Sequence, residues 1–317
     1  MILNLLVTRI CNLSCNYCRI TKYYTNIPKE YPRLKYYIGF NKSYKYFMDF
    51  IDFLKRYDND LFVLIYGGEP TLYNDFHLLI KSLYEKNVPS SVITNAMYPE
   101  NVKKVEPYLV GLTVSLDPNS IDKSRNIKSD YGLEMLKSYK NNNRLDKVAE
   151  VVVDKTNYKN IYSIVNLALE NNFRISVSII EEPLNNYYDF AEKNYNKNSL
   201  LLNKDQILEF REIINDIKGK YPEILVNPKG IEHVLSSSNG IVKCGYKNLN
   251  SLTMDADGSI RNCLRLRGTE TPTIDVEKYI KSDDYNGFIN EYIEKRKLDI
   301  RKYCEGCSWT CMYMEGG

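Results

Sequence analysis

Three cysteines near the start of the chain have the residue type and the spacing of a metal site. Cys11, Cys15 and Cys18 lie in the run VTRICNLSCNYC, with the spacing C-x3-C-x2-C, directly after a short apolar segment. A closed zinc site takes four protein ligands, so a site with three thiolates leaves one coordination position for a small molecule. Thiolates favour soft centres such as zinc, copper(I) or iron–sulfur clusters. We therefore expect a cluster with one iron that is free to bind a ligand; a zinc knuckle is the alternative.

This segment resembles the cluster loop of the radical S-adenosylmethionine (SAM) enzymes, including the aromatic Tyr17 just before the third cysteine. The resemblance implies a [4Fe–4S] cluster on the three thiolates, with the fourth iron chelated by the amino and carboxylate groups of SAM. It also implies an electron donor such as flavodoxin or ferredoxin, reductive cleavage of SAM, and a 5′-deoxyadenosyl radical that abstracts hydrogen from a substrate. Tyr17 is expected beside the adenine, with a plain core contact as the alternative.

A second motif, Tyr66-Gly67-Gly68-Glu69-Pro70, follows an apolar run that predicts a strand. Two glycines at a strand end allow close backbone approach, because a Cβ there would collide with a ligand. Glu69 can accept charge-assisted hydrogen bonds from an ammonium group. GGEP matches the radical SAM motif that holds the SAM amino group, and an ordinary turn is the alternative.

Polar residues also follow the later predicted strands. By resemblance, they approach the ribose and carboxylate of SAM, and Arg125 suits bidentate recognition of a carboxylate. Side chains of the other types are also routine turn and cap residues. For Arg125, a solvated surface position is the alternative. The residues are Thr94, Asn95, Ser115, Asp117 and Arg125.

The other five cysteines gather near the C-terminus. Cys244 and Cys263 frame the pattern C-x13-G-x4-C, and the alternation around Asp257-Gly258 predicts a hairpin between them. Cys304, Cys307 and Cys311 follow. Two distant pairs that converge on one centre form a four-thiolate site, for which zinc is one candidate.

The spacing of these cysteines resembles the auxiliary-cluster extensions of radical SAM enzymes, called SPASM and Twitch. Five cysteines are too few for a full SPASM domain, which favours the Twitch form with one auxiliary [4Fe–4S] cluster on Cys244, Cys263, Cys304 and Cys307. Three roles stay open for Cys311: a ligand in place of Cys307, a structural thiol under Trp309, or a hydrogen-atom donor near the substrate.

Composition limits the class of protein. The 317 residues carry a formal net charge of +3 without a large block of one sign, so binding of nucleic acid by a basic surface is not indicated. No apolar run approaches the roughly 20 residues of a membrane span, and no signal-like N-terminus is present, so we expect a cytoplasmic protein without a membrane partner. Eight cysteines, clustered at C-x2-C spacings, fit metal ligands better than disulfides in such a chain.

Apolar, β-rich runs alternate with helical stretches, which predicts a parallel sheet. We expect an α/β fold: a (β/α)6 partial TIM barrel over residues 1–200, a helical connection over 201–240, and a Twitch-like domain of a β-hairpin plus helix over 241–317. The predicted strands are Ile2–Thr8, Leu61–Tyr66, Ser91–Thr94, Gly111–Leu116, Ala149–Val153 and Arg174–Ile180. The predicted helices are Tyr44–Arg56, Phe76–Lys86, Leu133–Asn141, Asn160–Asn171 and Lys204–Lys218.

These features predict an enzyme that uses the SAM-derived radical on a substrate over the open mouth of the barrel. The auxiliary cluster would accept an electron or support the substrate site. A small molecule or nucleotide is favoured slightly as substrate, because no leader-binding extension precedes the first strand and the C-terminal extension is short. Modification of a peptide side chain is the alternative, and a non-catalytic iron–sulfur or zinc protein is the hypothesis of another class. General acid–base residues are not assigned; Asp154, Glu181 and Glu182 are placed near the mouth by position only.

Overall fold

The structure is a computed structural model, and it describes residues 1–15, 17–18, 41–117, 123–180, 200–226, 228–236, 251–261 and 274–303. Several predicted residues lie outside these ranges. They are Glu181, Glu182 and the five C-terminal cysteines, Cys244, Cys263, Cys304, Cys307 and Cys311.

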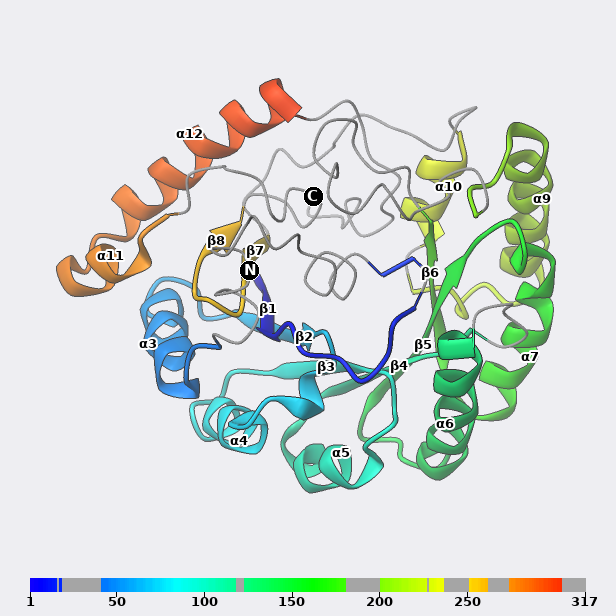
Figure 1. Ribbon diagram of the computed structural model, residues 1–317, viewed down its shortest axis with the longest axis horizontal. Coiled ribbons are helices and arrows are strands. Elements are labelled where there is room, and N and C mark those ends of the chain that lie inside the picture. The colour runs from blue at the N-terminus through cyan, green and yellow to red at the C-terminus, as the bar shows by residue number, and fades with distance from the viewer. Residues whose placement is uncertain are drawn as a thin grey trace, which may run out of the picture.

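A curled, mostly parallel sheet forms the centre of the fold (Figure 1). Its first six strands pair in parallel, each with its neighbour in sequence. They are β1 (Ile2–Thr8), β2 (Phe62–Gly67), β3 (Ser90–Thr94), β4 (Gly111–Ser115), β5 (Asp146–Val153) and β6 (Arg174–Ile179). This arrangement confirms the predicted partial barrel.

The sheet continues beyond β1 with strands from the C-terminal part of the chain. Strand β7 (Ser251–Met254) pairs in parallel with β1, and β8 (Ile260–Arg261) pairs antiparallel with β7. The hairpin predicted around Asp257-Gly258 is present, and Gly258 has a φ of +82°, a conformation that glycine adopts without strain. This hairpin is expected in the Twitch-like region over 241–317, and in the structure its first strand, β7, extends the barrel sheet as a seventh parallel strand.

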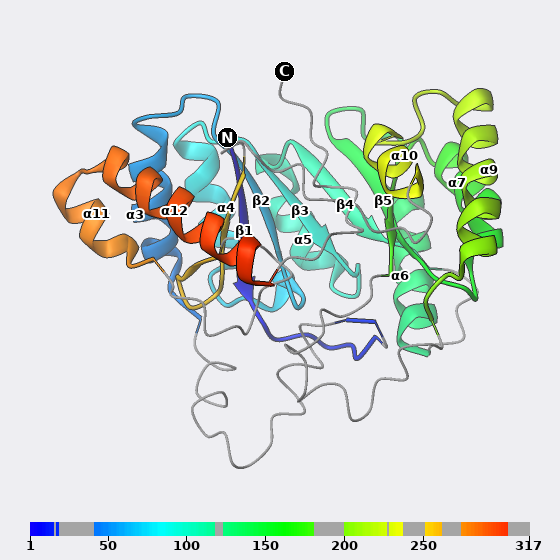
Figure 2. The ribbon, with the colours of Figure 1, turned by 90° about the horizontal axis from the view of Figure 1, so that it is seen from above.

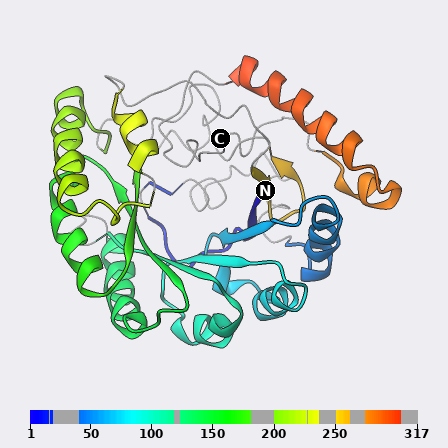
Figure 3. The same cartoon turned by 180° about the vertical axis from the view of Figure 1, so that it is seen from behind.

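Helices cover the outer, convex side of the sheet (Figures 1 and 3). They include α3 (Tyr44–Lys55), α4 (Phe76–Glu85), α5 (Pro99–Val105), α6 (Lys123–Tyr139), α7 (Ile161–Glu170) and α9 (Lys204–Lys220). Helix α10 (Pro228–Ser236) lies beside α9, at the β6 edge of the sheet. Short 3₁₀ turns occur at Pro70–Leu72, Glu106–Tyr108 and Tyr158–Asn160.

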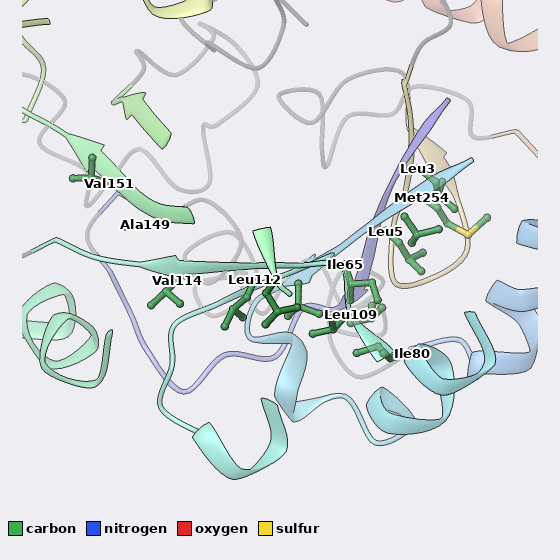
Figure 4. Packing of buried hydrophobic residues seen from close by; sticks show 14 of the residues in the cluster. Leu3, Leu5, Ile65, Ile80, Leu109, Leu112, Val114, Ala149, Val151 and Met254 are labelled. Carbon is green, nitrogen blue, oxygen red and sulfur yellow. The ribbon is translucent and has the colours of Figure 1, made fainter. Parts of the chain in front are cut away.

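The core lies between the sheet and these helices. Along β4, Leu112 and Val114 are fully buried and directed to the helix side, whereas Thr113 and Ser115 are partly exposed on the other face (Figure 4). This alternation is the period-two pattern of a strand that packs one face on helices. Ser115 in β4 and Ser178 in β6 are accordingly partly exposed on the inner face of the curl, near the ends of these strands.

Helix α6 begins ten residues before the start predicted from sequence, at Lys123 instead of Leu133. The side chains that its first turns bury are polar or charged, among them Arg125, Lys128 and Ser129. The apolar periodicity that marks a helix in sequence is therefore missing from this part of it.

The C-terminal helices α11 (Val276–Ser282) and α12 (Tyr285–Tyr303) pack against the outside of α3. Phe288 makes edge-to-face contacts with Phe50 and Phe53, with ring centroids 5.6 and 6.0 Å away. Tyr285 stacks on Tyr57 at 4.4 Å. Aromatic burial of this kind stabilises a contact beyond its area alone, so this part of the C-terminal region is built onto the barrel. No helix among the described residues is long and apolar enough to cross a membrane.

Candidate functional site

The cysteine loop lies beyond the carboxyl ends of the parallel strands, where ligand sites of such sheets occur. The chain leaves β1 at Thr8 and runs past the ends of the neighbouring strands (Figure 2). Cys11, Cys15 and Cys18 are not joined in a disulfide, and Cys15 is buried. A turn closed by a hydrogen bond from the Cys18 N–H to the Cys15 carbonyl, 3.0 Å long, precedes the third thiol.

The environment of Cys11 favours a thiol unless a cation is bound. Burial is the largest cause that raises its pKa to about 12, and negative charge on Cys18, Glu69 and Cys15 contributes to the same shift. The Leu13 N–H opposes this by donating to the Cys11 sulfur at 3.4 Å. Among the described residues, no group of three or more His, Cys, Asp or Glu side chains has the arrangement of a metal site. The ligand role of the cysteines rests on their chemistry: three thiols outside any disulfide on one short loop suit an iron–sulfur centre, whose positive charge would stabilise the thiolates.

The GGEP turn docks directly on the start of the cysteine loop. The Gly68 N–H donates to the Thr8 carbonyl at 2.7 Å, and the Glu69 N–H donates to the Ile10 carbonyl at 2.8 Å. A Cβ added to Gly67 would lie 2.5 Å from the Thr8 oxygen, and one added to Gly68 would lie 2.3 Å from the Ile10 oxygen. In the described structure, the glycines are thus required by their close approach to the loop backbone, whereas close approach to a ligand is the expectation from sequence.

The Glu69 carboxylate is buried, with 1% of the residue exposed, and is held by four donors. Its Oε1 accepts hydrogen bonds from the Thr71 hydroxyl at 2.6 Å, the Thr71 N–H at 3.2 Å and the Thr94 hydroxyl at 2.8 Å. Its Oε2 accepts from the Asn95 N–H at 2.8 Å. Burial raises the pKa of Glu69, and these donors oppose the shift. An ammonium group placed beside the carboxylate would favour its charged form, so the arrangement suits an amine ligand.

Thr94 and Asn95 therefore touch Glu69 and the cysteine loop. The Asn95 side-chain amide donates to Oδ1 of the Asn12 side chain at 2.8 Å, and its Nδ2 lies 3.9 Å from the Cys11 sulfur. Pro70 is buried and starts the 3₁₀ turn that brings Thr71 back to Glu69. The structure thus brings the residues predicted at the ends of β2 and β3 together with Cys11. Their contacts with SAM itself stay predictions.

A second set of interactions fixes Tyr17, between the second and third cysteines. Its hydroxyl accepts a hydrogen bond from the Lys128 ammonium at 2.7 Å and lies 3.5 Å from the Asp117 carboxylate. The Arg125 guanidinium carbon lies 4.9 Å from the centroid of the Tyr17 ring, and the Lys128 nitrogen lies 5.2 Å from it. Both distances are within the range of cation–π contacts.

Asp117 is the centre of this network and is completely buried. It forms ion pairs with Lys128 and, at 3.4 Å, with Arg125, and it accepts the Val152 N–H at 2.9 Å. Although burial alone would raise the pKa of Asp117, the two cations hold it below the usual range. Burial alone would lower the pKa of Lys128, but the charge of Asp117 raises it, so both groups stay ionised.

Arg125, predicted beside the SAM carboxylate, is fully buried among protein partners. It pairs with Asp154 and Asp117 and donates to the Val152 carbonyl at 2.6 Å. Asp154 in turn caps the turn after β5, since its Oδ1 accepts from the Thr156 N–H at 2.7 Å. Ser115 is partly exposed on the inner face of β4. The other residues predicted at the ends of β4 and β5, Asp117, Arg125 and Asp154, are fully buried, so Ser115 is the one among them that is partly exposed to solvent.

Sequence reasoning does not identify Lys128, Arg9, Asp255 or Asp257, although all four lie around the cysteine loop. For Lys128 a signal exists: it follows Arg125 by three residues, which places the two cations on one face of α6. Arg9 carries no signal beyond its place two residues before Cys11.

Comparisons with known proteins agree with this geometry. The profile of the Radical SAM superfamily matches residues 5–180. A 55-residue stretch, 17% of this chain, is 36% identical to the mouse protein named S-adenosyl-L-methionine-dependent tRNA 4-demethylwyosine synthase TYW1. The zebrafish protein of the same name is 33% identical over 60 residues. These stretches cover only 8% of the length of each curated relative.

Two solved structures of Streptococcus suis SuiB are similar in fold. The structure of SuiB bound to S-adenosylmethionine aligns with a TM-score of 0.65 and 17% identity, covering 93% of this chain and 67% of SuiB. The structure bound to the precursor peptide SuiA aligns with a TM-score of 0.65 and 18% identity, covering 100% of this chain and 71% of SuiB. At such identities the likeness concerns the fold alone. With a superfamily profile that spans more than half of its length, a curled half-barrel, and three closely spaced cysteines beside a GGEP turn, the chain belongs to the radical SAM superfamily of enzymes.

Proposed function

We propose that this enzyme cleaves SAM reductively and uses the resulting radical to remove a hydrogen atom from a substrate over the open mouth of the half-barrel. The observation that carries the proposal is the buried Glu69 carboxylate, oriented by four donors and docked on the loop of the three cysteines. When bound, a [4Fe–4S] cluster would supply one electron from flavodoxin or ferredoxin, the C5′–S bond of SAM would break, and methionine and 5′-deoxyadenosine would be released after hydrogen transfer.

The residues of the chain would bind and orient the cofactor. Cys11, Cys15 and Cys18 would hold the cluster. Glu69 would accept the SAM ammonium group, and Thr94 and Asn95 act by fixing that carboxylate.

The far end of SAM would meet the ends of β4 and β5. Tyr17 would lie beside the adenine, and Ser115 would contact the ribose. Asp117 and Arg125 would act mainly through Tyr17, because their charged groups already pair with Lys128 and Asp154.

The proposal is tested by anaerobic reconstitution with iron and sulfide, followed by dithionite and SAM. Chromatography with mass spectrometry should detect 5′-deoxyadenosine from the wild type. A protein that carries an intact cluster and forms none would refute the proposal.

We further propose that the C-terminal region binds one auxiliary [4Fe–4S] cluster through Cys244, Cys263, Cys304 and Cys307. Its support is the C-x13-G-x4-C spacing around a hairpin whose turn the structure describes. Cys263→Ala should lower the iron content by about one cluster's worth and leave the SAM-binding cluster in place. Unchanged iron, or zinc in purified protein, would contradict it. In Cys311→Ala, lost iron identifies a ligand, and intact iron with arrested turnover identifies a hydrogen donor.

For the substrate, we propose a peptide and keep a small molecule or nucleotide as the alternative. The support is a likeness of fold over 100% of this chain to SuiB, which has been solved bound to its precursor peptide. The test is to supply perdeuterated cell extract, separated into a peptide fraction and a small-molecule fraction, and to measure deuterium in 5′-deoxyadenosine. Transfer from the peptide fraction that protease treatment abolishes supports a peptide. Transfer from the protease-resistant small-molecule fraction supports the alternative.

A further inference from the structure

Arg9 lies between the end of β1 and the first cysteine, and its side chain is directed away from the GGEP turn, into the β7–β8 hairpin. Its Nε donates to the Asp255 carboxylate at 3.0 Å, and a terminal nitrogen donates to the Asp257 carboxylate at 2.8 Å. The side chain of Arg9 is 1% exposed, as is that of Asp255, and Asp257 is 10% exposed. A guanidinium that bridges two carboxylates in the protein interior fixes geometry more tightly than an exposed pair.

The acceptors belong to a rigid turn. Asp257 Oδ1 accepts the Ser259 N–H at 2.9 Å, and the Gly258 N–H donates to the Asp255 carbonyl at 2.8 Å. A Cβ on Gly258 would lie 2.4 Å from the Tyr46 ring, so the turn packs closely on α3. Burial would raise the pKa of Asp257, but Arg9 and the Ser259 hydrogen bonds hold it below the usual range. The partner of Arg9 is therefore a charged, fixed element.

The start of the cysteine loop is thereby held from both sides of β1. On the β2 side, backbone hydrogen bonds tie Thr8 and Ile10 to the GGEP turn. On the β7 side, Arg9 ties the residue between them to the hairpin. Arg9 precedes Cys11 by two residues, and the hairpin leads on in sequence to Cys263.

We infer that Arg9 is a positioning residue. Its ion pairs with Asp255 and Asp257 fix the position of the cysteine loop relative to the C-terminal hairpin, and so couple the C-terminal region to SAM cleavage. The inference deepens the proposed function and rests on it. Because catalysis depends on sub-ångström placement, a displacement of the loop by about 1 Å is expected to slow SAM cleavage by about 100-fold.

The test compares Arg9→Met with Arg9→Lys. Methionine keeps an unbranched apolar stem but loses both ion pairs, whereas the single ammonium of lysine can restore one of them. In the metal-free full-length chain, hydrogen exchange of the peptide over residues 9–18 should be faster in Arg9→Met than in the wild type and intermediate in Arg9→Lys. In reconstituted protein, the change that SAM causes in the EPR spectrum of the reduced cluster should be lost in Arg9→Met and partly restored in Arg9→Lys.

Asp257→Asn is the second variant, for use if Arg9→Met fails to fold, because it keeps the shape of the side chain and removes one charge. It should reproduce the altered EPR response in weaker form. Arg56→Met is the matched control: Arg56 pairs with Asp283 at 2.5 Å, also linking the barrel to the C-terminal region, but both side chains are about half exposed and far along the chain from the loop. It should leave exchange, EPR response and SAM cleavage unchanged.

If the wild type cleaves SAM and Arg9→Met or Asp257→Asn matches it in loop exchange and EPR response, the inference is wrong. An equal effect of Arg56→Met would also overturn it, since any loosening of the C-terminal region would then suffice. Absence of 5′-deoxyadenosine from the wild type would instead refute the proposed function.

Discussion

Lys128→Met should destabilise the protein by about 3 kcal/mol, because it removes one cation from a fully buried charge network. Removing one partner of a buried ion pair costs roughly 3–5 kcal/mol, since the remaining charge loses its compensation. The lower end applies here, because Asp117 keeps the Arg125 guanidinium at 3.4 Å and the Val152 N–H at 2.9 Å. For a chain of 317 residues, the average entropy of unfolding is about 0.7 kcal/mol/K, so the melting temperature should fall by roughly 4–5 °C.

Two other variants separate the parts of this effect. Tyr17→Phe keeps the ring and deletes the hydroxyl that accepts from Lys128 at 2.7 Å, which should cost about 1.5–3 kcal/mol for a hydrogen bond to a charged group. Lys137→Met is the control on the same helix, because Lys137 pairs with Glu134 at the surface and should contribute less than about 1 kcal/mol.

The assay is urea or thermal unfolding of the metal-free chain at several pH values. Asp117 has a lowered pKa in the folded state, so its contribution is present above its unfolded pKa of about 3.9 and is lost as the pH falls through the lower, folded value. The difference between wild type and Lys128→Met should accordingly shrink in acid. If Lys128→Met unfolds like Lys137→Met at neutral pH, the network does not hold Tyr17 as described.

Three further predictions concern the same site. Gly68→Ala should destabilise the protein by about 1–3 kcal/mol and lower the iron retained after reconstitution, because its Cβ would lie 2.3 Å from the Ile10 oxygen; Gly219→Ala, with nothing within 4 Å, should be neutral or stabilising in the same unfolding and iron assays. Glu150→Gln should be more stable than wild type at neutral pH, with the gain disappearing in acid, since burial raises the pKa of Glu150 and its ionisation opposes folding as the pH rises; unfolding curves that keep the same separation at every pH would contradict this. Cys15→Ala should abolish 5′-deoxyadenosine formation and lose the SAM-dependent EPR signal, and residual product at the wild-type rate would exclude this thiol as a ligand.

Much of the fold could be predicted from sequence because the strands and helices carry strong local patterns. The predicted bounds of β1 equal the observed ones, and those of β2, β3, β4 and β6 agree within one residue at each end. The parallel pairing of β7 with β1 could not be predicted, because it joins residues about 250 positions apart and leaves no periodic signal. A strand four residues long predicts a hairpin by its turn but not the sheet that it will join.

The candidate site divides in the same way. The cysteine loop and the GGEP turn could be predicted because their residue types and spacing are unusual. The sequence offers only the spacing from Arg125 as a signal for Lys128, and none for Arg9. A charged residue in sequence is most often solvated, and only docking of distant segments buries these two. The partners of Arg125 show the limit of reasoning by residue type: an arginine suited to a carboxylate does meet carboxylates, but here they are Asp117 and Asp154.

The described contacts give the cysteine loop three supports, each from a different part of the chain. The GGEP turn holds its start through the backbone, Asp255 and Asp257 hold Arg9, and Lys128 holds Tyr17. The loop residues described here lie outside helices and strands, so ordering them costs backbone entropy of about 1–2 kcal/mol per residue, which these contacts must offset. If the supports act on one ordered loop, a variant that disorders one end of the loop should reduce the destabilisation that a second variant causes. Arg9→Met combined with Tyr17→Phe should therefore be less destabilising than the sum of the two single changes, and strict additivity would mean that the two ends are ordered independently.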